Sequence, residues 1–286
     1  MDISIIIVSW NVRDLLHRCL LSIEKDGARL SHEVIVVDNN STDGSQDLVR
    51  ARHPGAHLIA LDSNRGFATG NNIGLRRARG RYVFFLNPDT EVVSGALAGL
   101  ARYLDEHADV AMIAPMLTNP DGSYQEGQVR RDPHILPEIL TVLKINHLTR
   151  SLAPFRAYYR ADFDPTREQD VEQIMGAAMF VRRSAIDRIG AFDERFFLWF
   201  EEVDLCLRFR NAGERIRFVP SFRVVHHGGK SFSKRQPYER QLIHNRSRTY
   251  FFRKHHGPLQ AWVLQALSPL GLLASYIYQL VFHGRS

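Results

Sequence analysis

The chain has 286 residues, of which 44% are hydrophobic and 24% are charged. This composition is typical of a globular protein that buries a core in one large domain or two small ones. The formal net charge of +6 is compatible with an anionic ligand, an anionic membrane surface or nucleic acid. Because the basic residues lack an RNA-binding aromatic signature, we expect no nucleic acid partner.

The N-terminus and the cysteines bear on the cellular compartment. The opening MDISIIIVSW has an early acid, no basic region and only a short apolar run, so it is not typical of a signal peptide, and we expect a cytoplasmic protein. Cys19 and Cys206 belong to no CxxC pair. We expect buried thiols in a reducing compartment, and a disulfide remains an alternative.

The first 115 residues alternate between apolar strands and amphipathic helices. The strand segments are runs without polar alternation, such as ISIIIV and EVIVV, which is typical of strands buried on both faces. Strands are predicted at 3–8, 33–37, 57–61, 81–86 and 110–114, and helices at 12–25, 45–52, 70–78 and 94–107. This spacing predicts an α/β fold with a mostly parallel, Rossmann-like sheet and helices on both faces.

The second part of the chain is less regular. Periodicity is weak from about 128 to 170, where proline and arginine are scattered, and we interpret this stretch as a variable segment. The elements predicted beyond it are a strand at 171–181, a helix at 201–211, short strands at 217–219 and 223–225, and a basic helix at 238–256.

The C-terminal stretch 258–282 has no charged side chain and follows Arg253-Lys254. Glutamine, serine and proline interrupt its apolar run, so a pair of short helices lying in a membrane interface fits better than a clean span. The basic flank favours the membrane surface. The alternative is a C-terminal helix packed on the core of the protein.

Polar residues follow three of the predicted strands. Ser9-Trp10-Asn11 follows the first, Asp38-Asn39-Asn40 the second, and Asn87-Pro88-Asp89 the strand that ends in VFFL. Ligands of open parallel sheets bind outside the carboxyl ends of the strands. Three clusters at one edge therefore indicate a binding site rather than helix caps alone. The sequence has no P-loop, HExxH or GxSxG motif, which argues against the corresponding classes of enzyme.

Seven stretches, found in order between residue 3 and about residue 254, carry a family resemblance: SIIIVSWN, VIVVDNNSTDGS, NRGFATGNNIGL, FFLNPDTEV, GAAMFVRR, GAFDERFFLWFEEVDLCLRFRNAG and VVHHGGKS. Together they resemble the family 2 inverting glycosyltransferases of the GT-A fold. The chain looks most like the bacterial branch that includes rhamnosyltransferases and other polysaccharide or cell-wall sugar transferases. The resemblance divides the chain into a nucleotide-sugar-binding half (1–115), an acceptor-binding and catalytic half of the same domain (116–257), and the apolar segment 258–286.

The resemblance assigns the strand-end residues to the donor. The family's DXD motif, which holds a divalent metal against the nucleotide-sugar diphosphate, corresponds to Asn87-Pro88-Asp89, with Asp89 as a ligand of Mg²⁺ or Mn²⁺. Because Asn87 is neutral, we expect weak metal binding without the nucleotide. Asp38 is expected to accept hydrogen bonds from the base. The other residues expected to contact the donor are Ser9, Asn11, Asn40, Arg65 and Asn72.

The second half supplies the expected acceptor side. Gly176 and Ala177 would let an acceptor sugar approach the backbone closely. Trp199 and Phe200 could form a sugar platform just before the acids Glu201, Glu202 and Asp204. An aromatic neighbour partly desolvates a carboxylate and raises its pKa towards the working range of a base.

The resemblance indicates which acid is the catalytic base and which histidine reaches the metal or the diphosphate. In the family the motif is usually Glu-Asp-x-Asp, and its second acid, the catalytic base, corresponds to Glu202, with Glu201 as the reserve. On a helix, positions 201 and 204 share roughly one face, and 202 points about 100° away. Of His226 and His227, the alignment of the two following glycines selects His226 as the residue that reaches the metal or the diphosphate.

The resemblance implies a metal-dependent transfer from a dTDP- or UDP-sugar, with dTDP-rhamnose first. The implied acceptor is a lipid-linked saccharide at the inner face of the membrane. Two other classes stay open: a nucleotidyltransferase that makes the sugar nucleotide, and a non-catalytic protein that only binds nucleotide or glycan. The first usually carries a glycine-rich basic loop after the first strand, and residues 9–18 contain no glycine.

Overall fold

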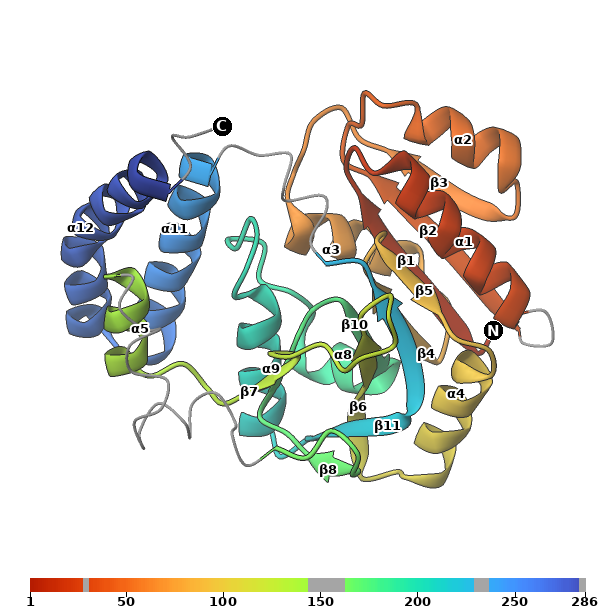
Figure 1. The fold of residues 1–286 in the computed structure, drawn as a ribbon. Coiled ribbons are helices and arrows are strands. Elements are labelled where there is room, and N and C mark those ends of the chain that lie inside the picture. The colour runs from red at the N-terminus through yellow and green to blue at the C-terminus, as the bar shows by residue number, and fades with distance from the viewer. Residues whose placement is uncertain (28–30, 144–162, 229–236, 283–286) are drawn as a thin grey trace.

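The computed structural model describes residues 1–27, 31–143, 163–228 and 237–282. Part of the variable segment (144–162) and the end of the VVHHGGKS motif lie outside the described residues. A mixed β-sheet forms the centre of the molecule, and helices α5, α11 and α12 stand together beside it (Figure 1). The elements named below keep the labels of that figure.

The main sheet has the strand order β3-β2-β1-β4-β10-β6-β11-β5, with β8 paired to β11. The strands from β3 to β4 are parallel to one another, whereas β10 runs antiparallel between β4 and β6. The strands of this sheet are β1 (Ile3–Ser9), β2 (His32–Asp38), β3 (Ala56–Ala60), β4 (Tyr82–Leu86), β5 (Thr90–Val92), β6 (Val110–Thr118), β8 (Gln169–Asp170), β10 (Ala178–Arg182) and β11 (Arg215–His226).

Helices cover both faces of the sheet, as predicted. The helices are α1 (Arg13–Gly27), α2 (Ser45–Arg52), α3 (Phe67–Arg77), α4 (Ala96–Glu106), α5 (Ile135–Val142), α8 (Arg183–Ile189), α9 (Glu201–Asn211), α11 (Pro237–His255) and α12 (Pro258–Phe282). A separate two-stranded sheet pairs β7 (Val129–Arg130) with β9 (Gln173–Ile174).

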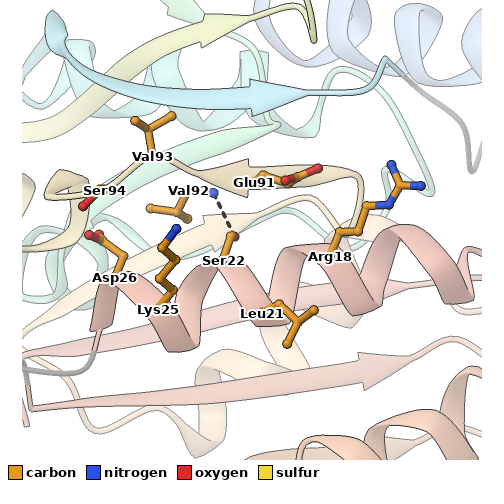
Figure 2. Close-up of a pocket in the computed structure, with 9 residues that line it drawn as sticks. All are labelled: Arg18, Leu21, Ser22, Lys25, Asp26, Glu91, Val92, Val93 and Ser94. Atoms are coloured by element: carbon orange, nitrogen blue, oxygen red, sulfur yellow. Dashed lines mark hydrogen bonds between the residues drawn. The ribbon is translucent and has the colours of Figure 1, made fainter.

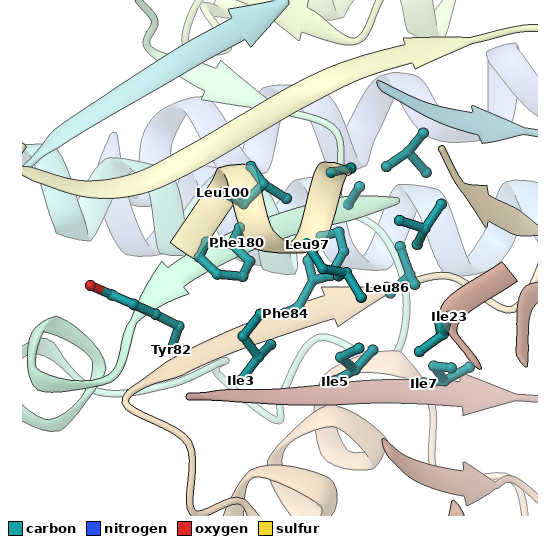
Figure 3. Packing of buried hydrophobic residues seen from close by; sticks show 14 of the residues in the cluster. Ile3, Ile5, Ile7, Ile23, Tyr82, Phe84, Leu86, Leu97, Leu100 and Phe180 are labelled. Atoms are coloured by element: carbon teal, nitrogen blue, oxygen red, sulfur yellow. The ribbon is translucent and has the colours of Figure 1, made fainter. Parts of the chain in front are cut away.

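Alternate residues of each strand enter different cores. Ile3, Ile5 and Ile7 of β1 pack with Phe84 and with helices α1, α2 and α4 (Figure 3). Ile6 faces the opposite cluster, beneath α3, α8 and α9. The apolar runs without polar alternation therefore reflect burial on both faces.

Several predictions for the second half of the chain differ from the structure. The single strand expected at 171–181 is split into β9 and β10, because Gly176 and its neighbours leave one sheet and enter another. The two short strands at 217–219 and 223–225 are one strand, β11, with an irregularity between Val219 and Arg223. The weakly periodic stretch contains the helix α5.

The C-terminal segment forms one helix, α12, with Pro269 inside it, instead of two short helices. Ala261 and Leu264 are buried against Phe251 and Phe252 of α11, so one side of α12 packs on the protein. Among the residues that the structure describes, every helix is too short or too polar to cross a membrane.

Both cysteines are free and buried. Burial raises the pKa of each thiol to about 12, so neither forms a thiolate at neutral pH. The disulfide alternative is thus not realised.

Candidate active site

The polar clusters that follow β1, β2 and β4 meet at one edge of the sheet. Ser9 at the end of β1 pairs in register with Asp38 at the end of β2, and Ile7 pairs with Leu86 at the end of β4. Adjacent parallel strands thus place residues that are about 30 and 80 positions apart in the sequence side by side.

Asp38 has one carboxylate oxygen in use and one without a partner. Its Oδ1 atom accepts hydrogen bonds from the Ser41 backbone N–H at 2.9 Å and from Gln46 Nε2 at 2.7 Å. Its Oδ2 atom is buried and makes no hydrogen bond, and the same is true of Ser9 Oγ beside it. Because buried polar atoms are nearly always paired, these two atoms can receive polar groups of a ligand.

The loops that follow β1 and β2 each contain an asparagine with a positive φ angle. Asn11 has φ 54° and Asn40 has φ 64°, a conformation that asparagine tolerates better than most residues. Asn11 Oδ1 accepts the Thr42 backbone N–H at 2.7 Å, while Asn40 is exposed. Arg65, also expected near the donor, pairs with Asp62 in a solvent-exposed contact.

Asn39 connects the end of β2 to the turn around Arg65, a role that the sequence did not indicate. Its side-chain amide donates to Gly66 O and accepts from the Arg65 backbone N–H. Gly66 has φ 85°, and a Cβ atom there would lie 2.3 Å from Phe197 O. Phe67 N also donates to Phe197 O. The turn therefore needs glycine, and it holds the loop that leads into α9.

Asn72 holds the same loop through its side-chain amide. Its Nδ2 atom donates to Phe192 O at 2.8 Å and to Glu194 Oε1 at 3.0 Å, and its Oδ1 atom accepts the Phe192 N–H. Both the oxygen and the nitrogen of the amide are hydrogen-bonded, so Asn72 holds residues 192–194 in place.

Asp89 and His226 lie together at the junction of β4, β5 and β11. His226 pairs in register with Thr90, and its Nε2 atom lies 3.4 Å from Asp89 Oδ1, with both side chains almost fully buried. His227 Nε2 lies instead 2.7 Å from Glu91 Oε1. His227 contacts Asp89 through its backbone N–H, which donates to Asp89 O. The imidazole beside the Asp89 carboxylate is that of His226, the histidine that the sequence selects.

These two residues fit a divalent metal. His226 Nε2 is buried without a hydrogen bond, and it lies beside a carboxylate oxygen. Neighbouring ligands of an octahedral ion are about 3 Å apart when the bonds are about 2.1 Å long. In the described part of the chain, no group of three histidine, cysteine or acidic side chains is arranged to hold a metal. An ion at this position would need further oxygen ligands from a bound diphosphate or water.

Gly176 and Ala177, which were expected to contact the acceptor, lie beside the strand end that carries Asp89. Asn87 N donates to Ala177 O at 2.9 Å, because β10 runs antiparallel to β4 and starts where β4 ends. A Cβ atom on Gly176 would lie 3.4 Å from Glu202 Cβ. The backbone at 176–177 thus separates Glu202 from the strand end that carries Asp89.

Glu201 and Glu202 stand at the start of α9, where Glu201 is buried and Glu202 is half-buried. Burial raises the pKa of Glu201 well above its ordinary value, and the charge of Glu202 raises it further. Burial also raises the pKa of Glu202, while backbone N–H groups and Arg130 act in the opposite direction. Each Oε2 atom lacks a hydrogen bond. Of the two, Glu202 is therefore the one that holds a negative charge more readily.

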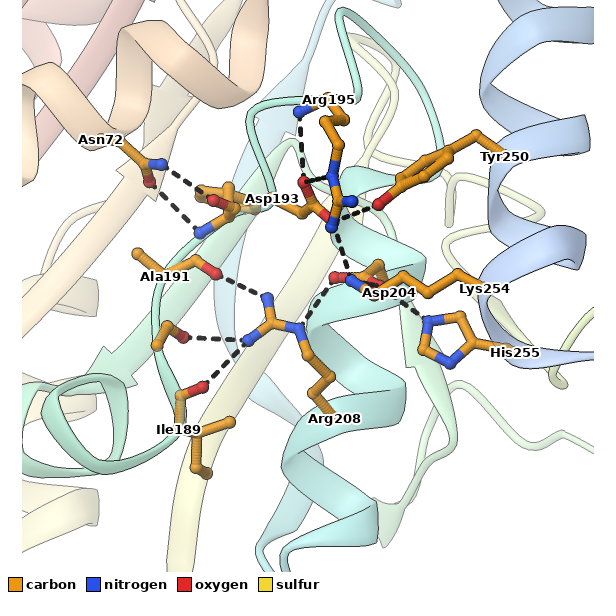
Figure 4. Close-up of polar contacts among 12 residues, drawn as sticks. Asn72, Ile189, Ala191, Asp193, Arg195, Asp204, Arg208, Tyr250, Lys254 and His255 are labelled. Atoms are coloured by element: carbon orange, nitrogen blue, oxygen red, sulfur yellow. Dashed lines mark hydrogen bonds and ion pairs between the residues drawn. The ribbon is translucent and has the colours of Figure 1, made fainter.

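Asp204 belongs to an ion-pair network that fastens α9 to α11 (Figure 4). Arg208 Nε contacts its Oδ2 atom at 2.8 Å, and Lys254 Nζ and His255 Nε2 contact its Oδ1 atom at 2.6 and 2.7 Å. Burial alone would raise the pKa of Asp204, but the hydrogen bonds from these three side chains lower it. The structure thus places Asp204 in a structural network, with both oxygens in use.

Trp199 and Phe200 occupy an unusual backbone conformation before the acids. Their φ angles are 65° and 69°, which is rare for bulky residues, and both rings contact His244 of α11. Phe200 is buried in the core between α9, α11 and α12, so its ring does not form an open platform. Trp199 is half-buried.

A separate cavity of about 400 Å³ lies between α1 and β5 (Figure 2). Ser22 on its wall accepts the Val92 N–H, and Asp26 accepts the N–H groups at the start of α4. None of the predicted site residues lines this cavity, and these polar side chains are already paired within the protein.

Comparison with solved structures defines the fold class. The mannosyltransferase PcManGT of Pyrobaculum calidifontis, solved with GDP-Man and Mn²⁺, matches with a TM-score of 0.57 and 18% identity, over 100% of this chain and 76% of that one. S. aureus TarS matches with a TM-score of 0.55 and 18% identity, over 85% of this chain and 39% of that one. The fold is the GT-A fold, as predicted, and the chain spans well under half of the full TarS protein.

The family follows from the sequence comparison. The model of the glycosyl transferase family 2 matches residues 4–189, and the chain belongs to this family. The N-acetylglucosaminyl-diphospho-decaprenol L-rhamnosyltransferase of Mycobacterium tuberculosis (strain CDC 1551 / Oshkosh) is 28% identical over 78% of this chain and 75% of its own length. The rhamnosyltransferase WbbL of Escherichia coli (strain K12) is 26% identical over 80% of this chain and 85% of its own length.

Proposed function

We propose that this protein is an inverting glycosyltransferase that uses a nucleoside-diphosphate sugar, with dTDP-rhamnose as the first candidate and a UDP-sugar as the second. The proposed acceptor is a lipid-linked saccharide in polysaccharide or cell-wall synthesis. The rhamnosyltransferase relatives support the donor, and the decaprenol-linked substrate in the name of one relative supports the acceptor.

One observation carries the proposal. Asn87 N bonds to Ala177 O, and Gly176 packs against Glu202. The acidic strand end and the half-buried Glu202 therefore lie on either side of a short stretch of backbone without bulky side chains. A sugar bound over that stretch would have a diphosphate side and a base side, which transfer with inversion requires.

The proposed step transfers one proton and exchanges one bond. The acceptor hydroxyl gives its proton to the Glu202 carboxylate while its oxygen forms a bond to the anomeric carbon of the donor. The bond from that carbon to the diphosphate oxygen breaks, and the electron pair leaves with the nucleoside diphosphate. The raised pKa of Glu202 makes it a stronger base than an exposed glutamate.

The donor would be held along the strand ends. Asp38 Oδ2 and Ser9 Oγ, both buried without partners, would receive the polar edge of the base. Asn11 and Asn40 would shape the pocket through their loops. A divalent ion held by Asp89 and His226 would neutralise the charge that develops on the leaving diphosphate.

A panel of nucleotide sugars tests this function. The purified protein is incubated with dTDP-rhamnose, UDP-glucose, UDP-N-acetylglucosamine or GDP-mannose and with Mg²⁺, Mn²⁺ or EDTA, in the absence of acceptor. We expect slow, metal-dependent release of nucleoside diphosphate from one donor, dTDP-rhamnose first. Formation of pyrophosphate from a sugar phosphate and a nucleoside triphosphate would identify a nucleotidyltransferase instead. Donor binding without turnover, even with lipid-linked acceptors, would indicate a non-catalytic protein.

We also propose that α12 places the enzyme on the inner face of the cell membrane. Its outward side carries large apolar residues that are more than half exposed, spaced along one helical face: Leu259, Trp262, Leu270 and Leu273. The exposed Arg253 at the end of α11 adds the positive charge that anionic lipids attract. A surface helix of this kind suits an enzyme whose acceptor is lipid-linked.

This surface is tested by substituting its exposed residues. Truncation is unsuitable because removal of α12 would also uncover Phe251 and Phe252. The variant changes Leu259, Trp262, Leu270 and Leu273 to serine, and the control changes the exposed Leu21 and Val93 to serine. Vesicles containing phosphatidylglycerol should sediment the wild type and the control but not the variant. The exposed apolar face could instead bind a second copy of the chain. In that case the wild type would be a dimer in solution, and the variant would be a monomer that still sediments with vesicles.

A further inference from the structure

We propose that Gln125 is a positioning residue that fixes the tautomer of His226, so that the nitrogen beside Asp89 has a free electron pair for a metal ion. Gln125 Oε1 lies 2.6 Å from His226 Nδ1. The inference rests on the proposed function, because it concerns the metal position of that site. Gln125 is separated from His226 by about 100 residues and lies in no motif of the sequence.

The direction of the bond between Gln125 and His226 follows from a chain of hydrogen bonds. The chain starts at Asp121, a carboxylate that can only accept. Ser123 therefore donates its hydroxyl hydrogen to Asp121 Oδ1, over 2.6 Å. The Ser123 oxygen then accepts from Asn119 Nδ2 at 2.9 Å, which requires the carbonyl oxygen of Asn119 to point the other way.

The second half of the chain reaches the histidine. Asn119 Oδ1 accepts from Gln125 Nε2 at 3.3 Å, and the same amide nitrogen also lies 3.4 Å from His226 O. Two acceptors therefore hold the amino end of Gln125, and its carbonyl end must face His226 Nδ1. A carbonyl oxygen can only accept, so Nδ1 carries the hydrogen.

A neutral imidazole with its hydrogen on Nδ1 has an electron pair on Nε2. That atom is buried, makes no hydrogen bond and lies 3.4 Å from Asp89 Oδ1. A hydrogen on Nε2 would block the metal position. Metal-binding histidines usually donate their other ring N–H to an acceptor that fixes the ring and its tautomer, and Gln125 provides such an acceptor.

The turn that carries this chain is built to be rigid. Gly122 adopts φ 85°, Asn119 N donates to Ser123 O, and Gly122 N donates to Asn119 O. Gln125 N also donates to Leu117 O of β6. The hydrogen-bond chain therefore keeps its direction before any ligand binds, and the His226 ring needs no reorganisation when an ion arrives.

Two substitutions at one position separate the tautomer from simple packing. Gln125→Met keeps the length of the side chain but removes the acceptor, whereas Gln125→Glu keeps an oxygen towards Nδ1. Gln265→Met is the matched control, since Gln265 is an exposed glutamine on α12. Long-range ¹H–¹⁵N spectra of protein labelled with ¹⁵N-histidine report the tautomer, and the His226 signal is identified by its loss in His226→Gln.

We expect the wild type, Gln125→Glu and Gln265→Met to show the hydrogen on Nδ1 of His226, without any metal. Gln125→Met should shift the ring towards the Nε2–H tautomer. In parallel, titration of Mn²⁺ in the presence of dTDP, followed by electron paramagnetic resonance, should give a dissociation constant about 10- to 100-fold higher for Gln125→Met. Gln125→Glu should restore the affinity of the wild type to within a few-fold.

The two measurements distinguish failure of the inference from failure of the proposed function. A wild-type His226 with its hydrogen on Nε2, or an unchanged tautomer in Gln125→Met, overturns the inference even if Mn²⁺ binds. A changed tautomer with an unchanged Mn²⁺ dissociation constant overturns it as well. If the wild type binds no Mn²⁺ with dTDP or UDP, the proposed metal position itself is wrong.

Discussion

Asp38 and Asp204 are both buried aspartates, but their surroundings are opposite. Asp204, at the start of α9, has side-chain partners at both oxygens, namely Arg208 at one and Lys254 and His255 at the other. Asp38, at the end of β2, uses Oδ1 for two neutral donors and leaves Oδ2 without a partner. The first environment is complete within the protein, and the second is complete only with a ligand.

The same difference extends to the residues around each aspartate. The network of Asp204 also includes Asp193, which pairs with Lys254 and accepts the Tyr250 hydroxyl, so its charges are matched. At the sheet edge, Ser9 Oγ and His226 Nε2 are buried without hydrogen bonds. Because leaving a buried polar atom unpaired costs free energy, such atoms in the site indicate that a ligand supplies the partners.

The largest expected effect is at the sheet edge. Asp89→Asn should abolish turnover with Mg²⁺ or Mn²⁺, because the neutral amide cannot supply the charge that holds a hard cation. The thermal unfolding midpoint should change little. The matched control is Asp47→Asn, an exposed acid on α2, which should keep full activity. Normal turnover of Asp89→Asn would show that Asp89 is not part of the active site.

Glu202→Gln should lower kcat by at least about 10²-fold, since it removes the proposed general base. Donor affinity should stay nearly unchanged, because Gly176 and Ala177 stand between Glu202 and the strand end that carries Asp89. Since burial raises the pKa of Glu202 above its ordinary value of 4.5, wild-type kcat should fall as the pH drops through that raised pKa. Near-normal kcat in Glu202→Gln, together with an inactive Glu201→Gln, would show that Glu201 and not Glu202 is the general base.

Asp204→Asn should mainly reduce stability. Removing the charge leaves Arg208, Lys254 and His255 without their common partner, and breaking a buried ion pair typically costs about 3 kcal/mol. Because the folded pKa of Asp204 is lowered from 3.8, its contribution is present above about pH 3.8 and is lost as the pH falls through the folded pKa. Urea unfolding should therefore show a larger difference in the free energy of unfolding between the wild type and Asp204→Asn at pH 7 than below pH 3.8. A large loss of kcat without loss of stability would assign Asp204 to the chemistry.

The smallest effect is a gain in stability from Glu201→Gln. The folded pKa of Glu201 lies well above 4.5, so the folded state keeps a proton that the unfolded state has lost. The stability of the wild type therefore decreases as the pH rises from 4.5 through the folded pKa, and the glutamine variant avoids this decrease. We expect a gain on the order of 1 kcal/mol at high pH and none below pH 4.5, measured by urea unfolding across this range. An equal gain at every pH would show that Glu201 is not the protonated acid.

The sequence by itself determined the parallel half of the fold and the place of the candidate site. Uninterrupted apolar strands and helical periods record which faces are buried, and this information is local. Because parallel strands end at the same edge, the polar residues after β1, β2 and β4 had to converge. The family motifs then single out Asp38, Asp89 and His226 among the many polar residues of the chain.

Only the tertiary structure decided which polar side chains are already paired. The antiparallel β10, which enters between β4 and β6, brings Ala177 to Asn87 and Gly176 to Glu202. The contact of Gln125 with His226 spans 101 positions. Asp204, unlike Glu202, is paired with basic side chains of α11, which supplies Lys254 and His255. Hydrogen bonds and ion pairs between distant segments depend on strand order and side-chain direction, and periodicity within one segment does not encode them.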